Sequence, residues 1–405
     1  MYNIWRNKKK KIERSWDKFI FNFRLNQETV KTHAAVIASA EYALSNCLLH
    51  ESVTTCLSSS DPVVRQGWAL KQQVEHDFRH LYAGKTAERI LIHVPSPDFS
   101  PAGYSLFTNL AESLNFIGVP TLILGWDADT AAMLNDFNPT VLLTSDHQRY
   151  LARIDWVAIA NYRKHRCLRV GLTASIAEYG NTPLQTRLVW AASHNVDFYY
   201  TFRDQAYVTT RMEYGPFLDA GYNFIYLPFG ANILHYYPVG GIERDLNFVI
   251  MATRKSEHIT YMKEIATRYP GFIDGPGWKH VSSFKFKRER DRYIYARAKV
   301  GLNVHLPEQI EWACEVNERT YQVAACGVPQ LIDHPKLIDK LFPPDTIYVA
   351  DTPIQYARIF QEILGQPELA LKRALLAQRE VFLRHTTFHR ADDFLRQLAQ
   401  ISTTK

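Results

Sequence analysis

Short apolar runs alternate with helix-length amphipathic segments through most of this chain of 405 residues. Each short apolar run predicts a buried strand, and each longer segment predicts a helix that returns to the next strand. Strands joined by helices wind in parallel, so the pattern predicts an α/β fold. In the first half, the expected strands are Arg89–Val94, Thr121–Leu124, Thr140–Thr144, Leu168–Leu172, Asp197–Thr201 and Phe224–Leu227.

The series begins again after Pro228–Gly241, an aperiodic segment that we interpret as an interdomain linker. The expected strands beyond it are Leu246–Met251, Gly271–Asp274, Val300–His305 and Gln330–Asp333. A chain of this length is too long for one ordinary core, which favours two domains. We therefore predict two Rossmann-like, doubly wound domains. The expected division is a helical N-terminal extension over residues 1–87, a first domain over 88–238, a second over 239–390, and a C-terminal helix over 391–405 that crosses back to the first domain.

The N-terminal segment carries the charge excess of the whole protein. Residues 1–24 hold eight Lys and Arg against two acids, which accounts for the formal net charge of +6. Trp16, Phe19 and Phe23 fall at helical spacing in the same segment. A basic amphipathic helix of this kind can lie on an anionic membrane surface, or its apolar stripe can pack on the protein body. Both interpretations stay open. The neutral remainder argues against a nucleic-acid-binding protein.

The cysteines indicate the redox compartment of the protein and do not suggest a metal or disulfide site. Cys47, Cys56, Cys167, Cys314 and Cys326 are scattered and odd in number, without a C-x-x-C pair. This argues against a disulfide framework or a zinc site and fits a reducing cytoplasm. No apolar run is long enough to span a bilayer, and no secretory signal is recognised. The expected location is cytoplasmic, with membrane association through residues 1–24 as the open alternative.

The stretch Glu315–Gln330 is the most informative part of the sequence. It predicts a helix from about Asn317 to Cys326, capped by Asn317 and ended by Gly327. The N-terminus of a helix that follows a parallel strand is a natural phosphate site. Arg319 lies in the first turn, where the dipole alone prefers an anion, so a bound anion would explain its presence.

The residues of this stretch also resemble a known family. The series Leu302-Asn-Val-His305, Asn317-x-Arg319-Thr-Tyr321 and Ala325-Cys-Gly327 is similar to the nucleotide-sugar-binding half of GT-B glycosyltransferases, in particular the CgeB-like branch with its pattern N-x-R-x-F-E-x-x-A-C-G. The tail His385-Thr-Thr-Phe-His-Arg390 resembles that branch's closing H-T-x-x-x-R. The resemblance covers roughly residues 246–400. Where the family has a Glu that holds the donor ribose, this chain has Gln322, which can hydrogen-bond but carries no charge.

The resemblance implies an enzyme that moves a sugar from a nucleotide-diphosphate donor to a glycan, lipid-linked or small-molecule acceptor. It implies two domains facing a cleft, a metal-independent and retaining reaction, and no cofactor. Transfer requires stabilisation of the leaving diphosphate, which cations and a helix N-terminus can supply. The expected catalytic residues are Arg254, Lys255, Arg319 and Glu315. The expected donor-binding residues are Asn303, His305, Asn317, Glu318, Gln322 and Gly327.

Several of these residues have a plain structural alternative. Arg254 and Lys255 follow a strand and can be ordinary loop charges, while Glu315 and Glu318 can simply favour the helix dipole. The loop Pro95–Gly103 should line the acceptor side, with His93 or Asp98 as the candidate general base.

Two further alternatives concern the metal and the function. Asp127-Ala-Asp129 looks like the D-x-D metal motif of another glycosyltransferase architecture, but a helix cap is the better interpretation. A non-catalytic scaffold, or a nucleotide-sugar epimerase or hydrolase, remains the alternative function, because Gln322 replaces the family's Glu.

Overall fold

The computed structural model describes residues 31–46, 52–174, 182–210, 212–281 and 287–402. The predicted basic helix at residues 1–24 lies outside them. Internal contacts divide the chain into two compact units. We call Gln73–Asn232 with Arg384–Lys405 the first-sheet unit, and Met1–Gln72 with Ile233–Leu383 the second-sheet unit. The division at 232/233 falls inside the segment predicted to be the linker.

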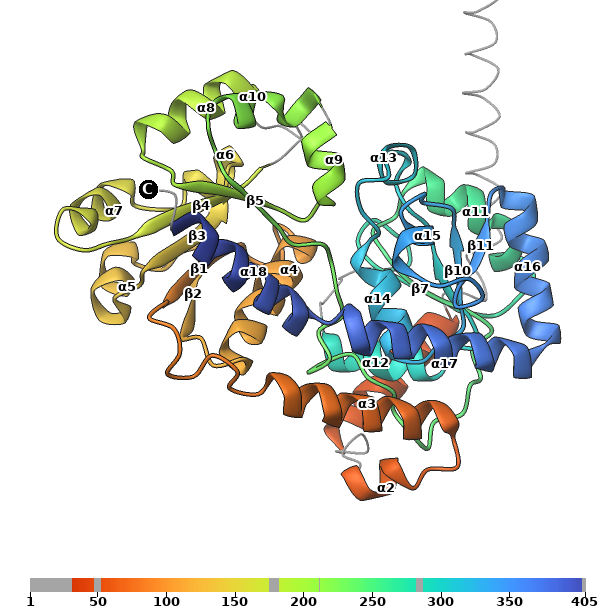
Figure 1. Ribbon diagram of the computed structural model, residues 1–405. Helices are drawn as coiled ribbons and strands as arrows, with labels where there is room; N and C mark the ends of the chain where they lie inside the picture. The colour runs from red at the N-terminus through yellow and green to blue at the C-terminus, as the bar shows by residue number, and fades with distance from the viewer. Residues whose placement is uncertain (1–30, 47–51, 175–181, 211, 282–286, 403–405) are drawn as a thin grey trace, which may run out of the picture. The chain divides into compact units, whose positions relative to one another are not determined.

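The first-sheet unit has, over the described ranges, a sheet of six parallel strands in the order β2-β1-β3-β4-β5-β6 (Figure 1). Its strands are β1 (Ile90–Val94), β2 (Thr121–Gly125), β3 (Val141–Ser145), β4 (Arg169–Thr173), β5 (Phe198–Thr201) and β6 (Phe224–Tyr226). Its helices are α4 (Pro101–Phe116), α5 (Thr130–Phe137), α6 (Gln148–Leu151), α7 (Trp156–Arg163), α8 (Leu184–Ser193), α9 (Gln205–Thr210), the 3₁₀ turn η1 (Met212–Tyr214), α10 (Gly215–Asp219) and α18 (Thr387–Ser402).

The second-sheet unit has five parallel strands within the described part of the chain, in the order β11-β10-β9-β7-β8. They are β7 (Val249–Met251), β8 (Phe272–Asp274), β9 (Gly301–Asn303), β10 (Gln330–Asp333) and β11 (Tyr348–Ala350). The helices are residues 31–45, α2 (Val53–Leu57), α3 (Pro62–Phe78, whose last residues pass into the first-sheet unit), α11 (Ser256–Ala266), α12 (Arg288–Ala296), α13 (Pro307–Trp312), α14 (Glu318–Ala325), α15 (Ile338–Leu341), α16 (Pro353–Gly365) and α17 (Pro367–Arg384).

Strand β9 shows how the second sheet is covered on both faces. Leu302 and Val304 belong to a core with buried residues of α11 and α16. Gly301 and Asn303 point the other way, as the two-residue period of a strand requires. Gly301 lies against Val323 of α14, where a Cβ would come within 2.5 Å of a methyl group. Strand β9 is therefore buried on both faces, as is usual in a parallel sheet covered by helices on each side.

The fold-class prediction is confirmed, since two parallel sheets with surrounding helices are present. Strand β11 (Tyr348–Ala350) was not predicted. The observed division differs from the predicted one at its ends. Part of the expected N-terminal extension contacts the second-sheet unit: the ring of His33 bonds Asp274 at 3.2 Å, and Trp68 donates to the Pro238 carbonyl.

Helix α18 belongs to the first-sheet unit and lies along α4 (Figure 1). Ser113 donates to Thr387 at 2.6 Å, Phe116 stacks on Phe388, and Gln397 accepts from the Tyr226 amide. Over the described ranges, none of the helices combines the length and apolar character needed to cross a bilayer.

Gly327 ends α14 and touches α3. Its φ of +70° is the left-handed conformation expected for a residue that terminates a helix. A Cβ at this position would come within 2.0 Å of Val63 Cγ1 and 2.9 Å of Gln378 Nε2. This contact lies at the opposite end of α14 from Asn317. Glycine here allows α3 and α17 to approach the helix end, while the donor contact expected of Gly327 stays a prediction.

We predict that Gly327→Ala lowers the melting temperature much more than Gly84→Ala. Both residues have φ near +70°, but nothing lies within 4 Å of a Cβ at Gly84. Ala in the left-handed region costs about 1–2 kcal/mol at either site, and overpacking adds about 1–3 kcal/mol at Gly327 alone. Scanning calorimetry measures both variants. Val63→Ala combined with Gly327→Ala should recover part of the loss, and equal losses in the two single variants would contradict the packing argument.

Candidate functional site

The carboxyl edge of the second sheet is where the fold places a ligand. In a doubly wound sheet, ligands bind outside the carboxyl ends of the strands at the point where the strand order reverses. Here that point lies between β7 and β9. The loop after β7 carries Arg254 and Lys255, the end of β9 carries Asn303 and His305, and α14 begins above them.

Asn303 connects these elements through its side-chain amide. Its Oδ1 accepts from Asn317 Nδ2 at 2.8 Å and from Arg319 Nη1 at 2.7 Å. Its Nδ2 donates to Asn317 Oδ1 at 3.0 Å and to Thr320 Oγ1 at 2.7 Å. The side chain is 0 % exposed and its bonding capacity is used in full. Asn303 therefore positions other residues, and a direct contact between Asn303 and the donor stays a prediction.

The same network fixes the start of α14. Asn317 is the N-cap, as predicted, and its side chain accepts from the Thr320 amide at 3.2 Å. Because both Asn side chains lock together, the first turn of α14 is held at the end of β9. The helix thus presents the positive end of its dipole at the carboxyl edge of the sheet.

Arg319 is the cation held at this helix end. Its Nε donates to the Met251 carbonyl at 2.9 Å and its Nη1 to Asn303. Among the described residues, no carboxylate lies within ion-pair distance of its guanidinium, and Nη2 has no protein partner. Burial lowers the pKa of Arg319 from its ordinary value, but an arginine remains charged at neutral pH. A half-buried charge that lacks a carboxylate within ion-pair distance among the described residues favours binding of an anion.

Arg254 lies in a loop that is tightly packed against its neighbour. Its amide donates to the Pro276 carbonyl at 2.8 Å, and its guanidinium lies 5.9 Å from the centre of the Trp278 ring. The Trp278 indole donates to Ala252 O at 2.8 Å. A Cβ at Gly275 would meet Ala252 O at 2.3 Å, so the two loops touch through backbone. Arg254 Nε is buried without a partner among the described residues, while Lys255 is exposed.

His305 lies at the same edge but is enclosed. Its Nδ1 pairs with Asp333 Oδ1 at 2.6 Å, and its amide donates to Asp333 Oδ2 at 2.7 Å. Both side chains are 0 % exposed. Nearby, burial and the Arg319 charge lower the pKa of His258 to about 4, so this imidazole is neutral at physiological pH. The His305–Asp333 pair ties the ends of β9 and β10 together, and His305 does not present a free surface to a donor.

The remaining predicted donor-side residues belong to α14 and the segment before it. Glu315 accepts from Gln309 at 2.8 Å, which holds its carboxylate beside α13. Glu318 lies in the first turn of α14. Gln322 lies one turn further along and is largely buried, and its side-chain amide has no protein partner within the described ranges. Of these, Gln322 keeps hydrogen-bonding groups available for a ligand.

His93 and Asp98 lie in the first-sheet unit and differ in environment. His93 is 0 % exposed, pairs through Nδ1 with Thr144 at 2.9 Å and stacks on Trp126. Burial lowers the pKa of His93 to about 4, so the ring is neutral. Asp98 is exposed on the loop after β1. The structure does not bring these two groups together as an acid/base pair.

The D-x-D motif provides a helix cap, as predicted. Asp129 is the N-cap of α5 and accepts from the Ala132 amide at 3.0 Å. Asp127 pairs with Arg153 at 2.7 Å. Both carboxylates are thus engaged by the protein.

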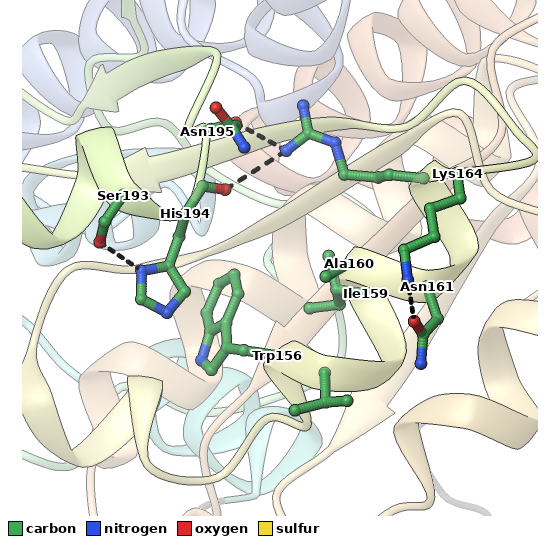
Figure 2. A pocket seen from close by; sticks show the side chains of 10 residues that line it. Trp156, Ile159, Ala160, Asn161, Lys164, Ser193, His194 and Asn195 are labelled. Atoms are coloured by element: carbon green, nitrogen blue, oxygen red, sulfur yellow. Dashed lines mark hydrogen bonds between the residues drawn. The ribbon is translucent and has the colours of Figure 1, made fainter.

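A pocket of about 730 Å³ lies elsewhere, between α7 and the end of α8 (Figure 2). Trp156, Ile159 and Ala160 line it on one side, and Ser193 and His194 on the other. Both helices end here before β4 and β5 begin, so the pocket lies toward the amino ends of the strands. None of the predicted site residues lines it.

Sequence reasoning missed Asp333, Trp278 and His258. Asp333 had a usable signal, because it is the last residue of a predicted parallel strand and therefore lies at the ligand-binding edge. Trp278 and His258 had none, since their contacts with Ala252 and Val304 join separate loops.

We predict that His93 makes folding sensitive to acid. Its pKa of about 4 lies below the ordinary value of 6.5, so the unfolded state binds more protons between these pH values. Stability is therefore lost as the pH falls through this window, by at most about 1.4 kcal/mol per pH unit. His93→Gln should reduce the drop in melting temperature between pH 7 and pH 5. The exposed His76→Gln is the control, and an unchanged drop in His93→Gln would refute the assignment.

Three comparisons with known proteins bear on this site. Residues 255–396 match the family model described as glycosyl transferase-like. Comparison with curated proteins gave no match. The structure is similar to sucrose-phosphate synthase from Thermosynechococcus elongatus, with a TM-score of 0.53 and 13 % identity over 78 % of this chain and 100 % of that one.

Two other solved structures have lower scores. HepE from Anabaena, in complex with UDP-glucose, has a TM-score of 0.49 and 12 % identity over 77 % of this chain and 99 % of that one. BGT of T4 phage, in complex with its substrate UDP-glucose, has a TM-score of 0.47 and 11 % identity over 78 % and 98 %. At these sequence identities a structural likeness shows the fold alone, and the fold is assigned from the likeness to sucrose-phosphate synthase. The chain has the GT-B fold, and its residues 255–396 match the glycosyl transferase-like family model.

Proposed function

We propose that this protein is a glycosyltransferase that takes a sugar from a nucleoside-diphosphate donor, whose diphosphate binds at the N-terminus of α14. One observation carries the proposal: Arg319 is a charged group without a carboxylate partner among the described residues, fixed beside that helix end by Asn303 and Met251. The match of residues 255–396 to a glycosyl transferase-like family supports it.

The proposed chemistry uses this charge for the leaving group. As the bond between the sugar's anomeric carbon and the diphosphate oxygen breaks, negative charge grows on that oxygen. The guanidinium and the helix dipole are fixed before the reaction, so they stabilise this charge without reorganising. The acceptor oxygen forms the new bond to the anomeric carbon, and its proton passes to the released diphosphate.

Further features of the reaction belong to the same proposal. Protein cations would act in place of a metal ion, with Arg254 and Lys255 of the loop after β7 as the additional contacts. Trp278 and the Gly275 loop support Arg254 in this role. Gln322 would bind the ribose through its amide. Transfer would retain the anomeric configuration, which NMR of the product tests directly.

A nucleotide panel tests the donor site. We expect one of the diphosphates UDP, GDP, ADP and dTDP, with CMP as the monophosphate comparison, to raise the melting temperature of the wild type. A ligand that binds only the folded state stabilises it, by about 2.7 kcal/mol at 100 times its Kd. Arg319→Ala should lose this shift. Arg319→Lys should keep part of it, since the charge remains but the two-pronged donor is lost.

Arg268→Ala serves as the control for that panel. Arg268 is an exposed arginine of the same unit that pairs with Glu264. Its variant should keep the full ligand shift, so a loss in Arg319→Ala cannot be assigned to general loss of charge. If no nucleotide shifts the folded wild type, the donor site proposed here is wrong.

A second candidate function, a non-catalytic scaffold, is favoured by the uncharged Gln322. We expect Gln322→Glu to tighten nucleoside-diphosphate binding, because a hydrogen bond to a charged acceptor is stronger by about 1 kcal/mol, or about fivefold in Kd. Calorimetric titration measures this, with pyrophosphate as the control ligand that lacks a ribose. Binding without sugar transfer in both forms would favour the scaffold, and an equal gain for pyrophosphate would refute the ribose contact.

A further inference from the structure

Aromatic side chains gather at the carboxyl edge of the first sheet. Five of them follow closely behind the ends of different strands: Phe99 after β1, Trp126 after β2, Tyr150 after β3, Phe202 after β5 and Phe229 after β6. This is the edge at which a doubly wound domain binds its ligand. The point where the strand order reverses lies between β1 and β3.

Three of these rings form one continuous surface, which we call the aromatic shelf: Phe99, Trp126 and Tyr150. The ring centres of Phe99 and Trp126 are 4.8 Å apart, and those of Trp126 and Tyr150 are 5.2 Å apart. Below the shelf, Trp126 stacks on the buried ring of His93 at 5.7 Å. Tyr150 is buried, while Phe99 is 37 % exposed. The shelf is thus backed by the core and open to solvent at Phe99.

Two arginines lie over the open side of the shelf. The Arg149 guanidinium is 5.5 Å from the centre of the Phe99 ring, and that of Arg153 is 5.6 Å from the Trp126 ring. Arg153 is neutralised by Asp127 at 2.7 Å. Arg149 is exposed and has no carboxylate within ion-pair distance among the described residues. Asp98, on the Phe99 loop, is a further exposed acid.

This combination matches one class of ligand. The face of a sugar ring presents C–H groups that pack on the electron-rich face of an aromatic ring. A guanidinium binds carboxylate or phosphate in a two-pronged geometry. An exposed arginine is held only weakly over an aromatic ring, so a ligand anion can recruit it at little cost.

We propose that the aromatic shelf with Arg149 binds an acceptor saccharide that carries a carboxylate or phosphate group. The sugar ring packs on Phe99 at the edge of the shelf, and the anionic group binds Arg149. The inference rests on the proposed function only in making this sugar the acceptor. Binding of the sugar itself stands independently of transfer.

The test measures binding of defined sugars to the full chain by saturation-transfer NMR and by titration of tryptophan fluorescence. The probes are maltose as a neutral sugar, digalacturonate as a carboxylate and glucose 6-phosphate as a phosphate. We expect one anionic probe to bind at least about tenfold more tightly than maltose, the gain from one charge-assisted hydrogen bond. The two anionic probes decide between carboxylate and phosphate.

Matched variants separate the ring from the charge. Arg149→Gln should remove the preference for the anionic probe, and Phe99→Leu should weaken all sugars, because it keeps an apolar side chain but loses the ring face. Arg166→Gln is the control, since Arg166 is also exposed and also lies 5.5 Å over an aromatic ring, that of Tyr162. It should change nothing.

The outcomes also separate this inference from the donor proposal. The nucleotide-induced melting shift should persist in Phe99→Leu and Arg149→Gln. If no nucleotide raises the melting temperature of the wild type while sugar binding still depends on Arg149, only the proposed transferase function would be overturned. Equal binding of neutral and anionic sugars, binding unchanged in both variants, or no binding of any probe at millimolar concentration would overturn the shelf assignment.

Discussion

The side-chain amide of Asn303 is the constraint on which the second-sheet unit's site depends. This amide is buried at the end of β9. Its oxygen accepts two hydrogen bonds, from Asn317 and Arg319, and its NH₂ group donates two, to Asn317 and Thr320. Because buried polar groups must be paired, this arrangement tolerates little displacement. It sets where α14 begins and where the guanidinium lies. An arginine is flexible on its own; here the strand end determines its position before any ligand arrives.

The sequence allowed much of this to be predicted, for identifiable reasons. Short, largely apolar runs between helix-length segments allowed ten of the described strands to be placed; β11 was not predicted. Asn317 and Gly327 predicted the ends of α14 because capping is local chemistry. The role of Asn303 could not be predicted, since a polar residue at a strand end can face a ligand or another side chain. Likewise, nothing local in the sequence links His33 to Asp274, which lie 241 positions apart.

The two sheets use their strand-reversal points in different ways. At the first, His93 pairs with a hydroxyl, is neutral, and supports a surface of aromatic rings. At the second, His305 pairs with the Asp333 carboxylate, and the Arg319 guanidinium donates to Asn303. The first edge therefore offers ring faces and the second a fixed positive charge. Similar topologies give chemically distinct surfaces, because the residues at and just beyond the strand ends differ.

The division of the chain has a consequence for how such a protein can be taken apart or recombined. Each compact unit is built from two separate stretches of sequence, because the N-terminal helices pack with the second sheet and α18 returns to the first. The segment that matches the family model, residues 255–396, coincides with neither unit. Cutting there would uncover the Gly327 surface that Val63 covers and strip α18 from its own sheet. A chimaera that exchanges one compact unit of this protein must therefore exchange both of its sequence segments together. The bounds of the family match do not mark where the chain can be divided.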